Sequence, residues 1–98
     1  MAQLKVGGVG TEIVLMAGDT LTNLSRALIF YMKPDGVTVG TFTAVADGTE
    51  NIKYTTTSVD DLDQEGNWLF EAYVEIDQWK GYGERAKHKV YPNLGVAP

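Results

Sequence analysis

Hydrophobic and polar residues alternate along most of this chain, most clearly between residues 68 and 76. One side of the alternation is apolar throughout and consists of Trp68, Phe70, Ala72, Val74 and Ile76. The other side is largely polar, which is the pattern of an antiparallel strand with one face in a core and one in solvent. A slip of one residue would place Glu71 and Glu75 in the core, so the pattern also predicts which face is buried.

The segment "GERAKHKVY" alternates in the same way and is expected to return beside the first strand as a long hairpin. The loop "QWKGY" between them is centred near Lys80. With that centre, Glu75 faces Arg85, and Glu71 faces Lys89. Opposite charges directly across a strand pair contribute about 0.2–1 kcal/mol each, so the charges favour this register.

Short extended segments separated by clusters of Gly, Asp, Asn and Pro make up the rest of the chain. Further strands are expected at 3–6, 11–17, 26–33, 37–46 and 52–57. The turn "PDG" ends one of them, since Pro fixes φ and Gly tolerates φ > 0. One short helical turn is expected near 58–63. About seven strands at this spacing predict an all-β fold, and we expect an immunoglobulin-like antiparallel sandwich.

The chain length of 98 residues fits a single domain spanning 1–98. Both ends are rich in Gly and Pro, and we expect 1–10 and 92–98 to act as arms that extend and add a strand to a neighbour's sheet edge. Within 37–46, one side of the alternation consists of Val37, Val39, Thr41, Thr43 and Val45.

The strand at 26–33 differs from the others because both of its faces are apolar. Ala27, Ile29 and Tyr31 form one face, and Leu28, Phe30 and Met32 form the other. In a sandwich only one face of each sheet lies in the core. The second face is therefore either covered by a loop of the same chain or meets another protein.

Composition excludes several classes of protein. The chain has no cysteine, so it has neither a disulfide nor a thiolate ligand or nucleophile. Its longest nearly unbroken apolar run is too short to cross a membrane. A net charge of −5 argues against nucleic acid as a partner, since phosphate binding requires a basic face, and it favours uncharged or basic partners.

The acidic stretch "DDLDQEG" at 60–66 has two readings. Asp61, Asp63 and Glu65 match the first positions of a calcium-binding loop of the EF-hand type, but the twelfth position, which requires a bidentate Glu, is Ala72. The structural reading is a corner, in which acidic side chains cap a single helical turn and Gly66 allows an abrupt exit into the strand that begins near Trp68. We favour the corner and predict no metal site, while a calcium site of another kind stays open.

No catalytic constellation is visible in the sequence. His88 is the only histidine and lies among lysines, so we expect a half-buried strand residue without a Ser or Asp partner. The glycine-rich "GGVGTE" lacks the lysine and the spacing of a phosphate-binding loop. We therefore expect a protein that is not an enzyme and that needs no cofactor.

Trp79 and Tyr82 belong to the expected tip of the last hairpin. Exposed Trp and Tyr side chains are favoured at binding hot spots, so the pair could form a platform that stacks on a glycan or anchors a receptor. Alternatively, Trp79 folds back and closes the open end of the sandwich. The candidate partner-binding residues are therefore Leu28, Phe30, Met32, Trp79 and Tyr82.

The order of these features resembles a known group of proteins. "VGGVGTEIVL", "LSRALIFYMKPDGVTV", a strand of Thr and Val, and "DLDQEGNWLFEAYVEIDQWKGYGERAKHKVY" follow one another over roughly residues 10 to 91. This order is similar to that of small immunoglobulin-like virion proteins of tailed bacteriophages, in particular the N-terminal domain of the phage baseplate upper protein family. The resemblance implies a structural protein of the phage particle, at the neck, tail, baseplate or capsid surface.

As a member of such a group the chain would be made in the bacterial host cytoplasm and would act through contacts with other virion proteins and with copies of itself. The rival function is a carbohydrate-binding or receptor-binding module that uses the aromatic hairpin tip.

Overall fold

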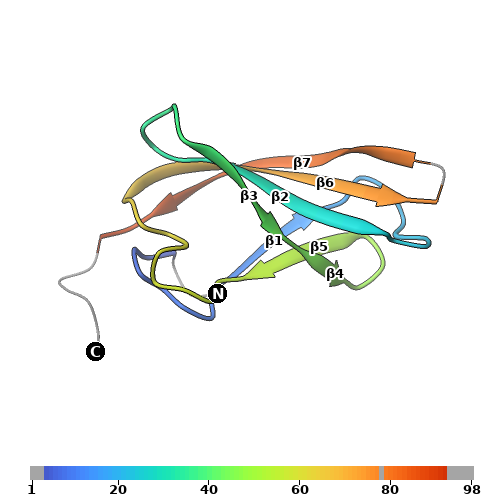
Figure 1. The fold of residues 1–98 in the computed structure, drawn as a ribbon, viewed down its shortest axis with the longest axis horizontal. Coiled ribbons are helices and arrows are strands. Elements are labelled where there is room, and N and C mark those ends of the chain that lie inside the picture. Colours follow the sequence, from blue (N-terminus) through green and yellow to red (C-terminus); the bar gives the residue numbers. More distant parts are fainter. Residues whose placement is uncertain (1–3, 78, 93–98) are drawn as a thin grey trace.

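The computed structural model describes residues 4–77 and 79–92, and within these ranges it contains seven β-strands and no helix (Figure 1). The strands are β1 (Glu12–Met16), β2 (Arg26–Met32), β3 (Val39–Thr43), β4 (Val45–Asp47), β5 (Asn51–Thr55), β6 (Gly66–Ile76) and β7 (Trp79–Val90). One sheet has three strands in the order β1-β5-β4, and the other has four in the order β3-β2-β6-β7. All neighbouring strands within these sheets are antiparallel.

The two sheets lie over one another as two layers, with hairpins β2–β3, β4–β5 and β6–β7 and with crossings between the sheets after β1, β3 and β5 (Figure 1). The predicted all-β antiparallel sandwich is thus confirmed. That the sandwich is immunoglobulin-like stays a prediction.

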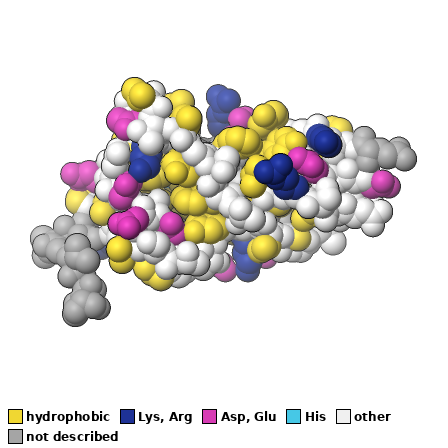
Figure 2. Space-filling model, viewed as in Figure 1, with side chains coloured by type: hydrophobic (Ala, Val, Ile, Leu, Met, Phe, Trp, Pro, Cys, Tyr) yellow, Lys and Arg dark blue, Asp and Glu magenta, His cyan; other side chains and the backbone are white. Residues whose placement is uncertain are grey.

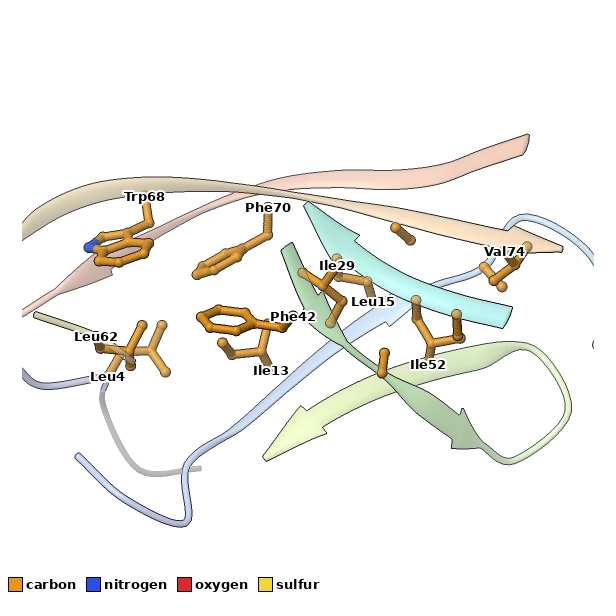
Figure 3. Packing of buried hydrophobic residues seen from close by; sticks show 14 of the residues in the cluster. Leu4, Ile13, Leu15, Ile29, Phe42, Ile52, Leu62, Trp68, Phe70 and Val74 are labelled. Atoms are coloured by element: carbon orange, nitrogen blue, oxygen red, sulfur yellow. The ribbon is translucent and has the colours of Figure 1, made fainter. Parts of the chain in front are cut away.

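The core lies between the layers and is built around β6. Trp68, Phe70, Ala72 and Val74 are buried, as the alternation predicts, and Ile76 packs against them partly exposed. Figure 3 shows Trp68 above Leu62 and Leu4, and Phe70 above Phe42 and Ile13. The facing side chains come from the other layer and from the loops; the buried ones among them are Leu4, Ile13, Leu15, Ala17, Ile52 and Leu62.

Residues 37–46, predicted as one strand, form two strands in different sheets. Ala44 still donates its N–H to the carbonyl of Ala27 in β2 at 2.9 Å, whereas the next residue, Val45, already pairs with Lys53 in the other sheet. The alternation itself holds across the crossing, because Phe42 and Ala44 are buried and the Val and Thr set is exposed.

The last hairpin forms, but its predicted register is wrong. β7 begins at Trp79, which pairs with Ile76, so the chain reverses before Trp79 and not near Lys80. Glu75 pairs with Lys80 and Glu71 with Arg85, with N–O distances of 4.0 and 3.3 Å. Both glutamates still lie opposite basic residues, although not the predicted ones. Basic residues recur along β7, so more than one register pairs opposite charges.

The register of this hairpin also shifts between Glu71 and Tyr73. Two residues of β7, Gly83 and Glu84, occupy the place opposite one residue of β6, which is the arrangement of a β-bulge. A Cβ atom on Gly83 would collide with the backbone of Met16 and Ala17. Glu84 accepts a hydrogen bond from the Met16 N–H at 2.9 Å. The bulge therefore brings the edges of the two sheets together.

Residues 4–10, expected to form an extended arm, instead lie against the sandwich. Leu4 is buried, Tyr91 donates its N–H to the Leu4 carbonyl at 2.8 Å, and Val6 donates to the Tyr91 carbonyl at 3.0 Å. Further along, the N–H of Gly10 donates to the Thr56 carbonyl. The rest of the two predicted arms, 1–3 and 93–98, lies outside the described residues.

Candidate functional site

The outer face of the four-stranded sheet carries a shallow groove with a volume of about 280 Å³. We call it the outer groove; its apolar side chains are Phe30, Met32, Val39, Leu69 and Tyr82, and the Glu71–Arg85 ion pair borders it. These residues come from all four strands of the sheet. Most of its lining is apolar, so we take the outer groove as the docking candidate.

Strand pairing brings these residues together. Met32 of β2 lies between Val39 of β3 and Leu69 of β6, its partners in the two neighbouring strands. Phe30, two residues earlier on the same face, lies opposite Glu71. Because side chains of paired residues point to the same face of a sheet, the apolar set forms one continuous surface.

Aromatic contacts join Phe30 to two tyrosines on the same face of the sheet. The ring of Phe30 lies 5.9 Å from Tyr73 and 5.9 Å from Tyr82, and the two tyrosine rings are 5.2 Å apart. The Tyr73 hydroxyl donates to Glu75 at 2.9 Å, and this hydrogen bond raises the pKa of Tyr73. The face is thus half-buried by its own neighbours in the sheet, and Tyr82 remains 60% exposed.

Basic side chains follow β7 along one border of this face. Lys80, Arg85, Lys87 and Lys89 all pair with outward-facing residues of β6 and are exposed. Lys80 and Arg85 lie near the carboxylates of Glu75 and Glu71. Although the whole chain is acidic, this border is therefore locally basic.

The predicted partner-binding residues fall into three places. Phe30, Met32 and Tyr82 lie together in the outer groove, and Leu28 lies in a neighbouring hollow beside Arg26, Thr43 and Val45. Trp79 lies elsewhere. Sequence reasoning missed Leu69 and Val39, which complete the groove. A signal for Leu69 existed, because it is an apolar residue on the largely polar side of the β6 alternation.

Trp79 and Tyr82 do not form a shared platform. Tyr82 pairs with the outward-facing Tyr73, whereas Trp79 pairs with Ile76, which packs against the core. The ring of Trp79 lies against Gly81, where an added Cβ would collide with it. The two rings therefore lie on opposite faces of β7, since successive strand residues alternate between faces.

The acidic stretch is a corner, although its predicted helical turn is wrong. Residues 59–62 form a hydrogen-bonded turn in which the Asp61 N–H donates to the Ser58 carbonyl at 3.1 Å, and no helix follows. The carboxylate of Asp61 accepts hydrogen bonds from the Tyr54 hydroxyl at 2.6 Å and from the N–H groups of Thr57 and Ser58 at 2.9 and 3.2 Å. It therefore binds groups that precede it in the chain, and does not cap a helix start.

These contacts set the pKa of Asp61. Burial raises it, but the hydrogen bonds from Tyr54, Thr57 and Ser58 outweigh burial, and the pKa lies below its ordinary value. For Tyr54, burial and the hydrogen bond to Asp61 raise the pKa of the phenol.

The neighbouring carboxylate of Asp63 points elsewhere. It binds the Lys33 ammonium group, with N–O distances of 2.8 and 2.9 Å, and this hydrogen bond raises the pKa of Lys33. The Trp68 indole N–H closes the corner by donating to the Gln64 carbonyl at 2.9 Å. Within 4–77 and 79–92 no group of three or more His, Asp or Glu side chains is arranged to hold a metal ion.

His88, predicted to be half-buried, is exposed on β7, with its ring centroid 5.9 Å from that of Phe70. The absence of an enzymatic activity and of a cofactor stays a prediction.

A comparison of the chain with protein-family models, with curated proteins and with solved structures finds no match. In the described ranges no helix is long and apolar enough to cross a membrane.

Proposed function

We propose that this chain is a non-enzymatic structural protein of a tailed phage particle and that it acts through protein–protein contacts. The observation that carries the proposal is the outer groove, an apolar surface built from all four strands and bordered by a basic row on β7. Surfaces with exposed aromatic anchors and a charged border are typical of docking sites. The resemblance in feature order to immunoglobulin-like virion proteins supplies the phage context.

The partner we propose for the outer groove is a segment of another virion protein with an apolar anchor flanked by acidic residues. Tyr82 would contact the anchor, because its ring is 60% exposed and is held from behind by Phe30 and Tyr73. Lys87 and Lys89 would attract the acidic flanks, since opposite charges steer association and restrict orientation.

Complementation of a phage that lacks this gene tests the proposal. Particles would be purified by density-gradient banding, and the amount of this chain in them measured by mass spectrometry. We expect the wild-type chain to remain with the particles and Tyr82→Ala to lower its content about tenfold, because truncating an interface tyrosine commonly costs over 1 kcal/mol.

Met16→Ala is the matched control. Met16 is 61% exposed, close to the value of Tyr82, but its strand β1 belongs to the other sheet. Equal incorporation of both variants would contradict the role of the outer groove. Absence of the wild-type chain from purified particles would contradict the virion role.

A further inference from the structure

The four edge strands of the sandwich are protected to very different degrees. Exposed strand edges present unpaired N–H and C=O groups to other chains, and proteins commonly protect them with charges, bulges or short strands. β4 is three residues long, and β7 carries a bulge and several lysines. On β1, Glu12 forms an ion pair with Lys53, and Glu84 binds the N–H of Met16. β3 has none of these protections.

The hydrogen-bonding groups of β3 can be assigned to its two sides. Ala44 donates to Ala27 and Lys33 donates to Thr38 at the two ends of the β2–β3 pair. Hydrogen-bonded and non-hydrogen-bonded pairs alternate along an antiparallel ladder, so the even-numbered residues of β3 face β2. The N–H and C=O groups of Val39, Thr41 and Thr43 consequently point away from the sheet.

Side chains along this edge are uncharged and unusually apolar. Residues 37–46 contain no charged residue, although the chain as a whole has a net charge of −5. Val39 of β3 is 64% exposed, and Val37, just before the strand, is 80% exposed. Figure 2 shows mainly hydrophobic and uncharged surface across the middle of the view, with charged side chains to either side of it.

We propose that β3 pairs antiparallel with β3 of a second copy of this chain, about a twofold axis at Thr41. Thr41 then faces Thr41 of the second copy, and Val39 faces Thr43. Each of these pairs exchanges two hydrogen bonds, because all three residues present their backbone groups at the free edge.

A second copy fits this edge for two reasons. Repulsion between two acidic molecules is smallest where neither carries charge, and no charged side chains would meet within 37–46. The edge is also self-complementary, since Thr–Thr and Val–Thr neighbours are favourable cross-strand pairs and a twofold axis places the same patch on both sides.

The dimer would join the two four-stranded sheets into one. Val39 borders the outer groove and also lies at the pairing edge. Side chains of paired residues point to the same face of a sheet, so both outer grooves would lie on the same side of the joined sheet. The inference rests on the assembly role proposed above and names one partner in it.

Cysteine cross-linking tests the pairing and its register, since the wild-type chain has no cysteine. Paired Cα atoms in a hydrogen-bonded pair are about 5.5 Å apart, a distance that a disulfide spans. We expect Thr41→Cys to form disulfide-linked dimers under mild oxidation. Val39→Cys and Thr43→Cys alone should not, because like residues would lie about 13 Å apart, but a mixture of the two should cross-link.

Thr49→Cys, in an exposed turn, is the control for random collision. If Thr41→Cys cross-links no faster than Thr49→Cys, the proposal is overturned. Faster cross-linking of Val39→Cys alone than of Thr41→Cys overturns it as well, since the axis would lie elsewhere.

Sedimentation of the uncross-linked chain provides an independent test. We expect the wild-type chain to form a concentration-dependent dimer. Thr41→Lys should associate about fivefold more weakly, because it places two ammonium groups opposite each other. Thr49→Lys, the control, should associate like the wild type. A wild-type chain that stays monomeric at every concentration overturns the pairing. Such a monomer, if still incorporated into particles through Tyr82, would leave the assembly role intact.

Discussion

Asp61→Ala removes the acceptor of three hydrogen bonds in the loop between β5 and β6. Each hydrogen bond to a charged group contributes about 1.5–3 kcal/mol. Water replaces part of the lost hydrogen-bond energy in the variant, because the carboxylate is only half-buried and the amides of Thr57 and Ser58 become accessible. We therefore expect the free energy of unfolding to fall by about 2–3 kcal/mol, well below the summed contribution of the three hydrogen bonds. Tm should fall by about 10–20 °C.

Urea denaturation at neutral pH measures this change, and two further variants separate its parts. Asp61→Asn keeps an oxygen acceptor without the charge and should cost about 1 kcal/mol. Tyr54→Phe removes one donor while keeping the ring stacked on Phe42. A double-mutant cycle of Asp61→Ala and Tyr54→Phe should give a coupling energy of about 1 kcal/mol, because the two groups bond directly.

The pH dependence follows from the lowered pKa of Asp61. A carboxyl group whose pKa is lower in the folded chain stabilises it above the unfolded pKa, near 3.8, and loses that contribution as the pH falls through the folded value. The stability difference between wild type and Asp61→Asn should thus be constant at neutral pH and shrink below about pH 4.

A loss under about 0.5 kcal/mol for Asp61→Ala, or no coupling to Tyr54, would refute this account of the corner. A rise in Tm on adding calcium, abolished by Asp61→Asn, would refute it as well, since the carboxylate would then be a ligand.

Three further changes test the packing and the turns. Gly83→Ala should destabilise the fold by about 1–3 kcal/mol, since the new methyl group meets the β1 backbone; a neutral effect on urea denaturation would contradict the close contact. Trp68→Phe should lower the free energy of unfolding by about 2–3 kcal/mol, because it removes the donor to the Gln64 carbonyl and opens a gap in the core. An unchanged Tm would contradict this. Hydrogen bonds from the residues that follow it lower the pKa of Asp35 to about 2, so the Tm values of wild type and Asp35→Ala should converge between pH 4 and 2; divergence on acidification would contradict the turn geometry.

The strands with the strongest alternation could be predicted from the sequence because burial imposes a period of two. Trp68, Phe70, Ala72 and Val74 are the clearest example, and all four are buried. Sheet membership was not predictable for 37–46, since the same alternation continues while the chain passes from one sheet to the other at Ala44.

The predicted register of the last hairpin was wrong for a related reason. Glu71 and Glu75 can meet basic residues in several registers, so charge pairing alone does not choose among them. The structure places the turn earlier, and Trp79 becomes the first residue of β7. A separation of three within a strand puts Trp79 and Tyr82 on opposite faces, which could not be known while both were assigned to a loop.

Only part of the outer groove could be found in the sequence. Phe30 and Met32 were predicted because their strand is apolar on both faces. Val39 and Leu69 join them through pairing with Met32, which depends on long-range register. A strand pattern predicts which residues face outward, but not which neighbours share that face.

The contact between residues 4–6 and Tyr91 has a consequence for biosynthesis. As the nascent chain leaves the ribosome, Leu4 has no partner at Tyr91 until β7 has emerged, and the four-stranded layer lacks its edge strand β7 until then. Apolar side chains of the earlier strands stay open to chaperones throughout elongation. Folding should therefore finish in one late step, and translation that stalls before residue 79 should release a chain destined for proteolysis.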